Sequence, residues 1–176
     1  MSSYLTAPST LSLGLLLARV VVGPLMAAHG AQKLFGWFGG PGLRTTGESM
    51  TQLGFRPGRV FAAAASITEI AGGILITLGF LGPIGPALML SVMIVAAVTV
   101  HWRNGVFAMQ NGIELPLLYA TAAVGLAMTG FGQYAVDAWL GIAVGLPSTG
   151  IVLAAGAVGA IANLTLRRTP GRAVRT

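Results

Sequence analysis

The sequence contains no cysteine, and only four of its 176 residues are acidic. Without thiols the chain forms no disulfide, has no thiolate nucleophile and has no cysteine ligand for zinc or for an iron–sulfur cluster. It carries no haem or flavin signature either, so electrons for any redox reaction would have to come from the cofactor of a partner. We therefore expect no intrinsic cofactor.

Charge is scarce throughout the chain: 8% of the residues are charged and 55% are hydrophobic. Because roughly a quarter of the residues of a soluble domain are charged, this composition is typical of an integral membrane protein. The formal net charge of +6 does not indicate nucleic-acid binding, since the basic residues of a membrane protein first report its topology. The expected surroundings are a lipid bilayer, and no nucleic acid is expected as a partner.

Five apolar runs are candidates for transmembrane helices, each of which needs about 20 apolar residues to cross a hydrocarbon core of ~30 Å. They cover residues 11–34, 60–81, 86–100, 113–131 and 149–166. The turn residues at 82–86 predict an antiparallel hairpin of the second and third runs. The predicted fold is all-α, with a short tail (1–10), an antiparallel four-helix membrane core (11–140), an additional transmembrane helix (141–166) and a basic tail (167–176).

The basic residues fall almost entirely on one side of this predicted arrangement. Nine of the ten lysines and arginines lie in the connections and the tail of that side, and the tenth is Arg19, inside the first apolar run. Because loops rich in Lys and Arg stay in the cytoplasm, the N-terminus is predicted to lie outside and the C-terminus in the cytoplasm. The basic tail would also be attracted to anionic lipid headgroups.

Arg19 and Glu69 lie deep inside the first two apolar runs, where a charge is costly and marks a functional or pairing site. Counted from opposite ends of antiparallel helices, each lies about 14 Å into the membrane at 1.5 Å per residue. Since consecutive helices usually pack together, we expect Arg19 and Glu69 to pair. The small residues Ala62, Ser66 and Gly73 turn Glu69 toward the bundle. Such a pair is either a register-setting ion pair or a proton or ligand site.

A second polar group is predicted at the cytoplasmic end of the bundle. His29 and Lys33 close the first apolar run, His101 closes the third and Glu114 opens the fourth. Two histidines and a carboxylate can ligate a metal, but these residues have no close ligand spacing, so we expect no metal. The favoured interpretation is a polar, headgroup-sized pocket.

The first connection is long, aromatic and rich in glycine. Trp37 and Phe38 are typical of the aromatic belt at the membrane interface, and the glycines around them prevent the helix from continuing. The segment Thr46–Phe55 predicts a short surface helix whose apolar side chains, including Met50 and Phe55, dip into the bilayer. This connection is an interfacial anchor or, because its glycines permit motion, a lid over the histidines.

The segment His29–Gly42, with the sequence HGAQKLFGWFGGPG, resembles the His-Gly, Lys-Leu and Gly-Gly pattern of the DoxX family of small bacterial membrane proteins. Weaker similarities follow in the same order at Leu53–Pro57, Glu69–Gly73 and Gly130–Asp137. The last of these carries Phe131 where the family usually has proline. The resemblance covers about residues 15–140 and implies a multi-pass protein of the bacterial plasma membrane with a four-span core.

The same resemblance implies a role near redox enzymes. Relatives are linked to quinol oxidases, to thiosulfate–quinone oxidoreductases and to a membrane complex with a superoxide dismutase and a sulfurtransferase. This favours a non-catalytic or quinone-interacting subunit of a membrane redox complex, with a membrane or peripheral protein as its partner. The alternatives are a scaffold that anchors partners through Ala155, Gly159 and Asn163, and a small-molecule or lipid transporter. We expect an accessory subunit rather than a self-sufficient enzyme.

Overall fold

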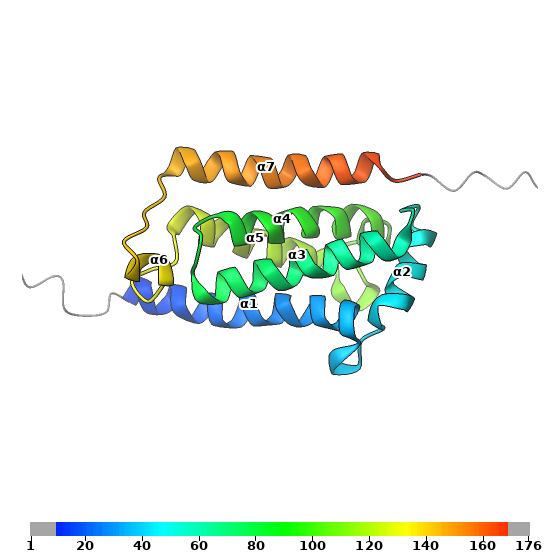
Figure 1. Ribbon diagram of the computed structural model, residues 1–176, viewed down its shortest axis with the longest axis horizontal. Helices are drawn as coiled ribbons and strands as arrows, with labels where there is room; N and C mark the ends of the chain where they lie inside the picture. Colours follow the sequence, from blue (N-terminus) through cyan, green and yellow to red (C-terminus); the bar gives the residue numbers. More distant parts are fainter. Residues whose placement is uncertain (1–9, 169–176) are drawn as a thin grey trace, which may run out of the picture.

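The computed structural model describes residues 10–168, and over these residues it is helical without any strand (Figure 1). The predicted all-α class is therefore confirmed. The predicted N-terminal tail, apart from Thr10, and the predicted basic tail from Thr169 on lie outside the described residues. The α-helices are α1 (Thr10–Phe35), α2 (Gly42–Gln52), α3 (Gly58–Leu78), α4 (Ile84–Ala96), α5 (Glu114–Thr129), α6 (Val136–Trp139) and α7 (Leu146–Thr165).

Four helices of the described chain are long and apolar enough to cross a membrane. They are α1, α3, α4 with its continuation to Asn104, and α7. The continuation is a π-helical turn, Ala97–His101, followed by a 3-10 turn, Trp102–Asn104. The predicted span 113–131 is shorter than expected, because α5 has 16 residues and rises only about 24 Å at 1.5 Å per residue. It ends before Gly130, whose φ of 73° is incompatible with a continuing helix.

Helices α1 and α3 form the closest pair of the bundle, and three glycines determine how they meet. A Cβ atom built at Gly23 would lie 2.6 Å from the carbonyl oxygen of Gly73, and one at Gly30 would lie 2.5 Å from that of Ser66. The backbones are therefore in direct contact at two levels, which only glycine permits at these positions. This contact determines which residues of α1 and α3 lie opposite each other.

Helix α4 lies in the middle of the bundle and packs against α3, α5 and α7. Figure 1 shows α7 on the opposite side of α4 and α5 from α1. Gly156 of α7 approaches α4 so closely that a Cβ there would lie 2.6 Å from the carbonyl oxygen of Ala87. The C-terminal end of α7 is joined to the α2–α3 connection, where Arg167 Nε donates to the Leu53 carbonyl (2.5 Å) and the Arg168 amide donates to the Gly54 carbonyl (2.9 Å).

The two ends of the bundle differ in charge. One end, which we call the basic end, gathers the basic side chains of the described chain other than Arg19: Lys33, Arg44, Arg56, Arg59, Arg103, Arg167 and Arg168. The other end is closed by the short helix α6 (Figure 1). There the carboxylate of Asp137 accepts hydrogen bonds from the amides of Leu81 (3.0 Å) and Gly82 (2.6 Å) and so stabilises the α3–α4 turn.

Candidate functional site

Arg19 lies in α1 close to the α6 end of the bundle and is only 2% exposed. Its Nη1 donates to the Leu78 carbonyl at 3.0 Å, and its Nη2 donates to the Tyr134 carbonyl. Leu78 is the last residue of α3, where helix carbonyls lack partners within the helix and attract cations. Arg19 therefore fastens α1 to the end of α3 and to the loop that precedes α6.

The predicted Arg19–Glu69 pair is wrong. Nine residues of α3 separate Glu69 from Leu78, which Arg19 contacts, and nine residues rise about 14 Å. The two charges were expected at one depth on the assumption that both helices begin level with the membrane surface. The glycine contacts between α1 and α3 instead place Gly30 opposite Ser66 and Ile70, so Glu69 faces the last turns of α1.

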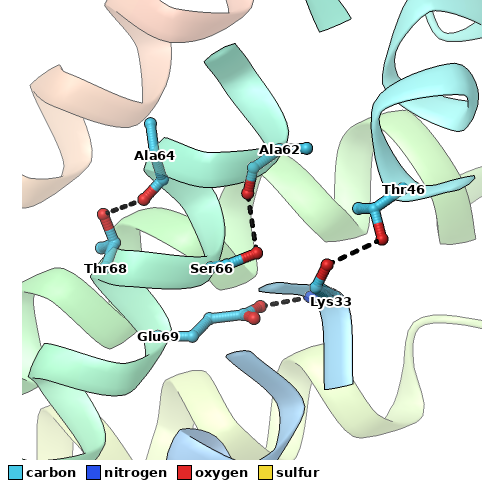
Figure 2. A network of polar contacts seen from close by, with 7 residues as sticks. All are labelled: Lys33, Thr46, Ala62, Ala64, Ser66, Thr68 and Glu69. Atoms are coloured by element: carbon cyan, nitrogen blue, oxygen red, sulfur yellow. Dashed lines mark hydrogen bonds and ion pairs between the residues drawn. The ribbon is translucent and has the colours of Figure 1, made fainter. Parts of the chain in front are cut away.

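Glu69 pairs with Lys33 rather than with Arg19. Lys33 Nζ donates to Glu69 Oε1 at 2.5 Å, and the two side chains are 32% and 0% exposed (Figure 2). The Thr46 hydroxyl of α2 donates to the Lys33 carbonyl at 3.3 Å, so three helices meet at this residue. Glu69 Oε2 has no hydrogen-bond partner among the described residues. The buried carboxylate therefore holds the lysine ammonium while keeping one acceptor position open.

Two aromatic groups complete what we call the Glu69 cluster: Glu69, Lys33, His29 and Tyr119. The rings of His29 and Tyr119 meet edge to face with centroids 5.9 Å apart. Both groups lie close enough to Glu69 to interact with it electrostatically. Sequence reasoning missed Tyr119, although it is the only tyrosine within a predicted span. The cluster brings together titratable side chains from α1, α3 and α5.

His101 and Glu114 are not part of the Glu69 cluster. His101 Nδ1 lies 2.8 Å from the Asn111 carbonyl oxygen, and Glu114 Oε2 accepts a hydrogen bond from the Ala108 amide at 2.7 Å. Both side chains therefore order the loop between α4 and α5. Because a carbonyl oxygen only accepts hydrogen bonds, Nδ1 is the donor in this contact, and in the neutral tautomer that donates from Nδ1 the other ring nitrogen, Nε2, is an acceptor. Among the described residues, no group of His, Asp or Glu is arranged to hold a metal ion.

A cavity of about 320 Å³ opens at the basic end between α2, α3, α4 and α7; we call it the basic-end cavity. Lys33 and His101 both line it, whereas His29 and Glu114 do not. The cavity thus includes two of the four residues that were expected around a headgroup-sized pocket, and its ligand stays a prediction. Its other polar lining residues are Thr46, Ser49, Thr68, Ser91, Thr99 and Asn163.

Apolar side chains make up the rest of the cavity wall and include the segment that was expected to dip into lipid. Phe55 is 1% exposed and packs against Phe61 with ring centroids 5.1 Å apart. Met50 of α2 lines the cavity beside it. The expectation that these side chains enter the bilayer is wrong, because α2 packs against α1 and α3 and turns its apolar face inward. Apolar walls with a few polar groups are typical of small-molecule sites of 300–1,000 Å³.

Trp37 and Phe38 lie apart from this cavity. Both rings are largely exposed on a 3-10 turn, Trp37–Gly39, that projects beside the end of α1 (Figure 1). Neither residue lines the basic-end cavity. An interfacial anchor needs such exposed rings, and that role stays a prediction for this turn.

Long apolar helices that bury an ion pair in their interior define a multi-pass membrane protein. The family comparison is more specific: the model of the DoxX family matches residues 14–102, which is half of the chain. The chain belongs to the DoxX family. The matched region runs from α1 to the end of the π-helical turn after α4 and includes both Lys33 and Glu69. No curated protein and no solved structure matches the chain.

Proposed function

We propose that this DoxX-family protein is a non-catalytic, quinone-interacting subunit of a membrane redox complex, and that the basic-end cavity holds the quinone ring. The observation that supports this most directly is the Lys33–Glu69 pair at 2.5 Å. A buried ion pair stabilises a fold no better than well-packed apolar side chains would. The value of the pair lies in positioning, since Glu69 holds the ammonium of a lysine that also lines the cavity.

The cavity has the chemistry that a quinone ring requires. The apolar wall, with Phe55 and Phe61, suits the ring, and the Lys33 ammonium donates to a carbonyl oxygen. The Nε2 lone pair of neutral His101 accepts from the hydroxyl group that forms when the ring is reduced. Electrons come from the cofactor of a partner, because this chain has no cysteine and no redox signature of its own.

We further propose that the basic end faces the cytoplasm of a bacterium and that the N-terminus lies outside. The clustering of basic residues at that end supports this orientation through the positive-inside rule. A reporter enzyme that is active only outside the plasma membrane should be inactive when fused to the C-terminus. An active C-terminal fusion would reverse the orientation and place the cavity in the outer half of the membrane.

The quinone proposal is tested with purified protein and a variant that lacks the ion pair without leaving a buried charge. Lys33→Met combined with Glu69→Met keeps similar side-chain volumes and should fold. Quinone that copurifies with the wild-type protein, identified by mass spectrometry, should fall at least tenfold in this variant. Arg44→Met is the matched control, since Arg44 is an exposed basic residue at the same end. Equal quinone in both variants, or none in the wild-type protein, would rule the proposal out.

The alternative proposal is a scaffold that uses the basic tail and the small-residue face of α7, formed by Ala155, Gly159 and Asn163. Gly159 and Asn163 line the basic-end cavity, whereas Ala155 is exposed. A scaffold would therefore have to use the outer face of α7, where Ile151 and Val158 are exposed. Loss of copurifying proteins on deletion of α7, with retained quinone in the remaining bundle, would favour the scaffold.

A further inference from the structure

We infer that the basic-end cavity opens sideways into the bilayer between α3 and α7, and that its ligand is a membrane-dissolved molecule whose apolar tail lies in this opening. This inference rests on the proposed function only in that the polar ring of the ligand is taken to be a quinone. Four residues line the cavity and are also exposed on the surface: Ser49, Val100, Ala64 and Gly159. Ser49 and Val100 lie toward the basic end, whereas Ala64 of α3 and Gly159 of α7 lie deeper, on two membrane-spanning helices. We call Ala64 and Gly159 the mouth.

The packing of α7 leaves the mouth open. The helix is seated on α4 through Gly156 and through Ala160, which is fully buried. It is joined to the α2–α3 connection only further along, by Arg167 and Arg168. Gly159 lies beside the first of these attachments but on another face of the helix, because a Cβ built there would meet no atom within 4 Å. Figure 2 shows Ala64 on the face of α3 that is turned toward the pale helix α7.

The depth of the mouth points to acyl chains rather than water. Ala64 lies six residues from the start of α3 and Gly159 lies six residues from the end of α7. Both are therefore about 9 Å from the basic end at 1.5 Å per residue, within helices that are long enough to span the membrane. Because no water occupies the hydrocarbon core at that depth, only a membrane-dissolved molecule reaches the mouth.

The charged and imidazole groups of the cavity lie only at its basic end, whereas its deeper polar groups are the hydroxyls of Thr68 and Ser91. Lys33 and His101 come from the ends of α1 and of the π-helical turn, close to the interface, whereas the mouth has only small apolar groups. A membrane amphiphile has the same arrangement, with its polar ring near the interface and its tail toward the bilayer centre. Because both mouth residues are small and a Cβ built at Gly159 meets no atom within 4 Å, a larger side chain at Gly159 should close the mouth.

The first test closes the mouth and compares two probes with the same ring. The probes are a benzoquinone with a decyl tail and the same benzoquinone without a tail, and the protein is reconstituted in lipid nanodiscs. Gly159→Phe should weaken binding of the tailed probe at least tenfold and change binding of the tailless probe less than twofold. Gly150→Phe is the matched control, because Gly150 lies on the same helix, is exposed and has no atom near its Cβ position. Equal loss of both probes, or of neither, would overturn the inference.

The second test does not depend on quinone and uses the absence of native cysteine. Ser91→Cys places one thiol on the cavity wall. It should react faster with an apolar maleimide dissolved in the bilayer than with a charged, water-soluble thiol reagent. Added Gly159→Phe should slow the apolar reagent at least tenfold, and added Gly150→Phe should not. Faster reaction with the charged reagent would show that the cavity opens to water and would refute the sideways mouth. If the labelling pattern is as expected but the protein binds no quinone, only the proposed function is refuted.

Discussion

Removal of Lys33 should destabilise the protein far more than removal of its partner Glu69. The two side chains differ in exposure, at 32% for Lys33 and 0% for Glu69. Lys33→Met leaves a carboxylate in the bundle with no counter-charge, which costs about 3–5 kcal/mol. Glu69→Gln leaves an ammonium that still reaches the cavity and still has an amide oxygen as acceptor, so the loss is about 1–2 kcal/mol.

The assay is the free energy of unfolding of purified protein in mixed micelles of dodecyl maltoside and sodium dodecyl sulfate. The double variant Lys33→Met/Glu69→Met tests the physical cause, because it contains no unpaired charge. Its stability should lie within about 1 kcal/mol of the wild-type protein, since apolar replacement of a complete buried pair is often neutral. Equal losses for the two single variants, or additive losses in the double variant, would refute the reasoning from the buried carboxylate.

Two further predictions use the same unfolding assay. Gly23→Ala should lower the free energy of unfolding by about 1–3 kcal/mol, because its methyl group would lie 2.6 Å from the Gly73 carbonyl oxygen and force α1 and α3 apart. The control Gly14→Ala, whose methyl group would meet no atom within 4 Å, should leave the free energy of unfolding unchanged. Equal effects of the two substitutions would refute the close contact. Asp137→Asn should lower the free energy of unfolding by about 1–3 kcal/mol. The Asp137 carboxylate accepts hydrogen bonds from the Leu81 and Gly82 amides, whereas the asparagine side chain has one N–H donor group that would face one of these amides. Unchanged stability would show that these bonds do not support the turn.

Much of this protein follows from its sequence. Apolar runs near 20 residues long predict membrane helices because the thickness of the hydrocarbon core determines helix length. The small residues Ala62, Ser66 and Gly73 predict that Glu69 faces the interior, and Glu69 is fully buried. The segment His29–Gly42 indicates the DoxX family, to which the chain belongs. These features depend on local composition, so no tertiary information is needed to recognise them.

The partner of Glu69 was decided only by the tertiary structure. Hydropathy determines the length of each membrane helix, but it does not determine how far one helix is shifted along its axis relative to its neighbour. That offset is determined by the places where two backbones can touch, here Gly23 against Gly73 and Gly30 against Ser66. The expected partner Arg19 and the observed partner Lys33 are fourteen residues apart on α1, which is about 21 Å at 1.5 Å per residue.

The cavity depends on the tertiary structure for the same reason. Its lining residues come from α1, α2, α3, α4, the π-helical turn and α7, and they share no sequence pattern. Whether Phe55 meets lipid or Phe61 depends on how α2 is turned against α3, and whether Gly159 meets a partner or a cavity depends on where Gly156 contacts α4. Composition alone determined that this chain lies in a membrane, whereas the contacts between helix backbones decided which charges meet there and what space they leave.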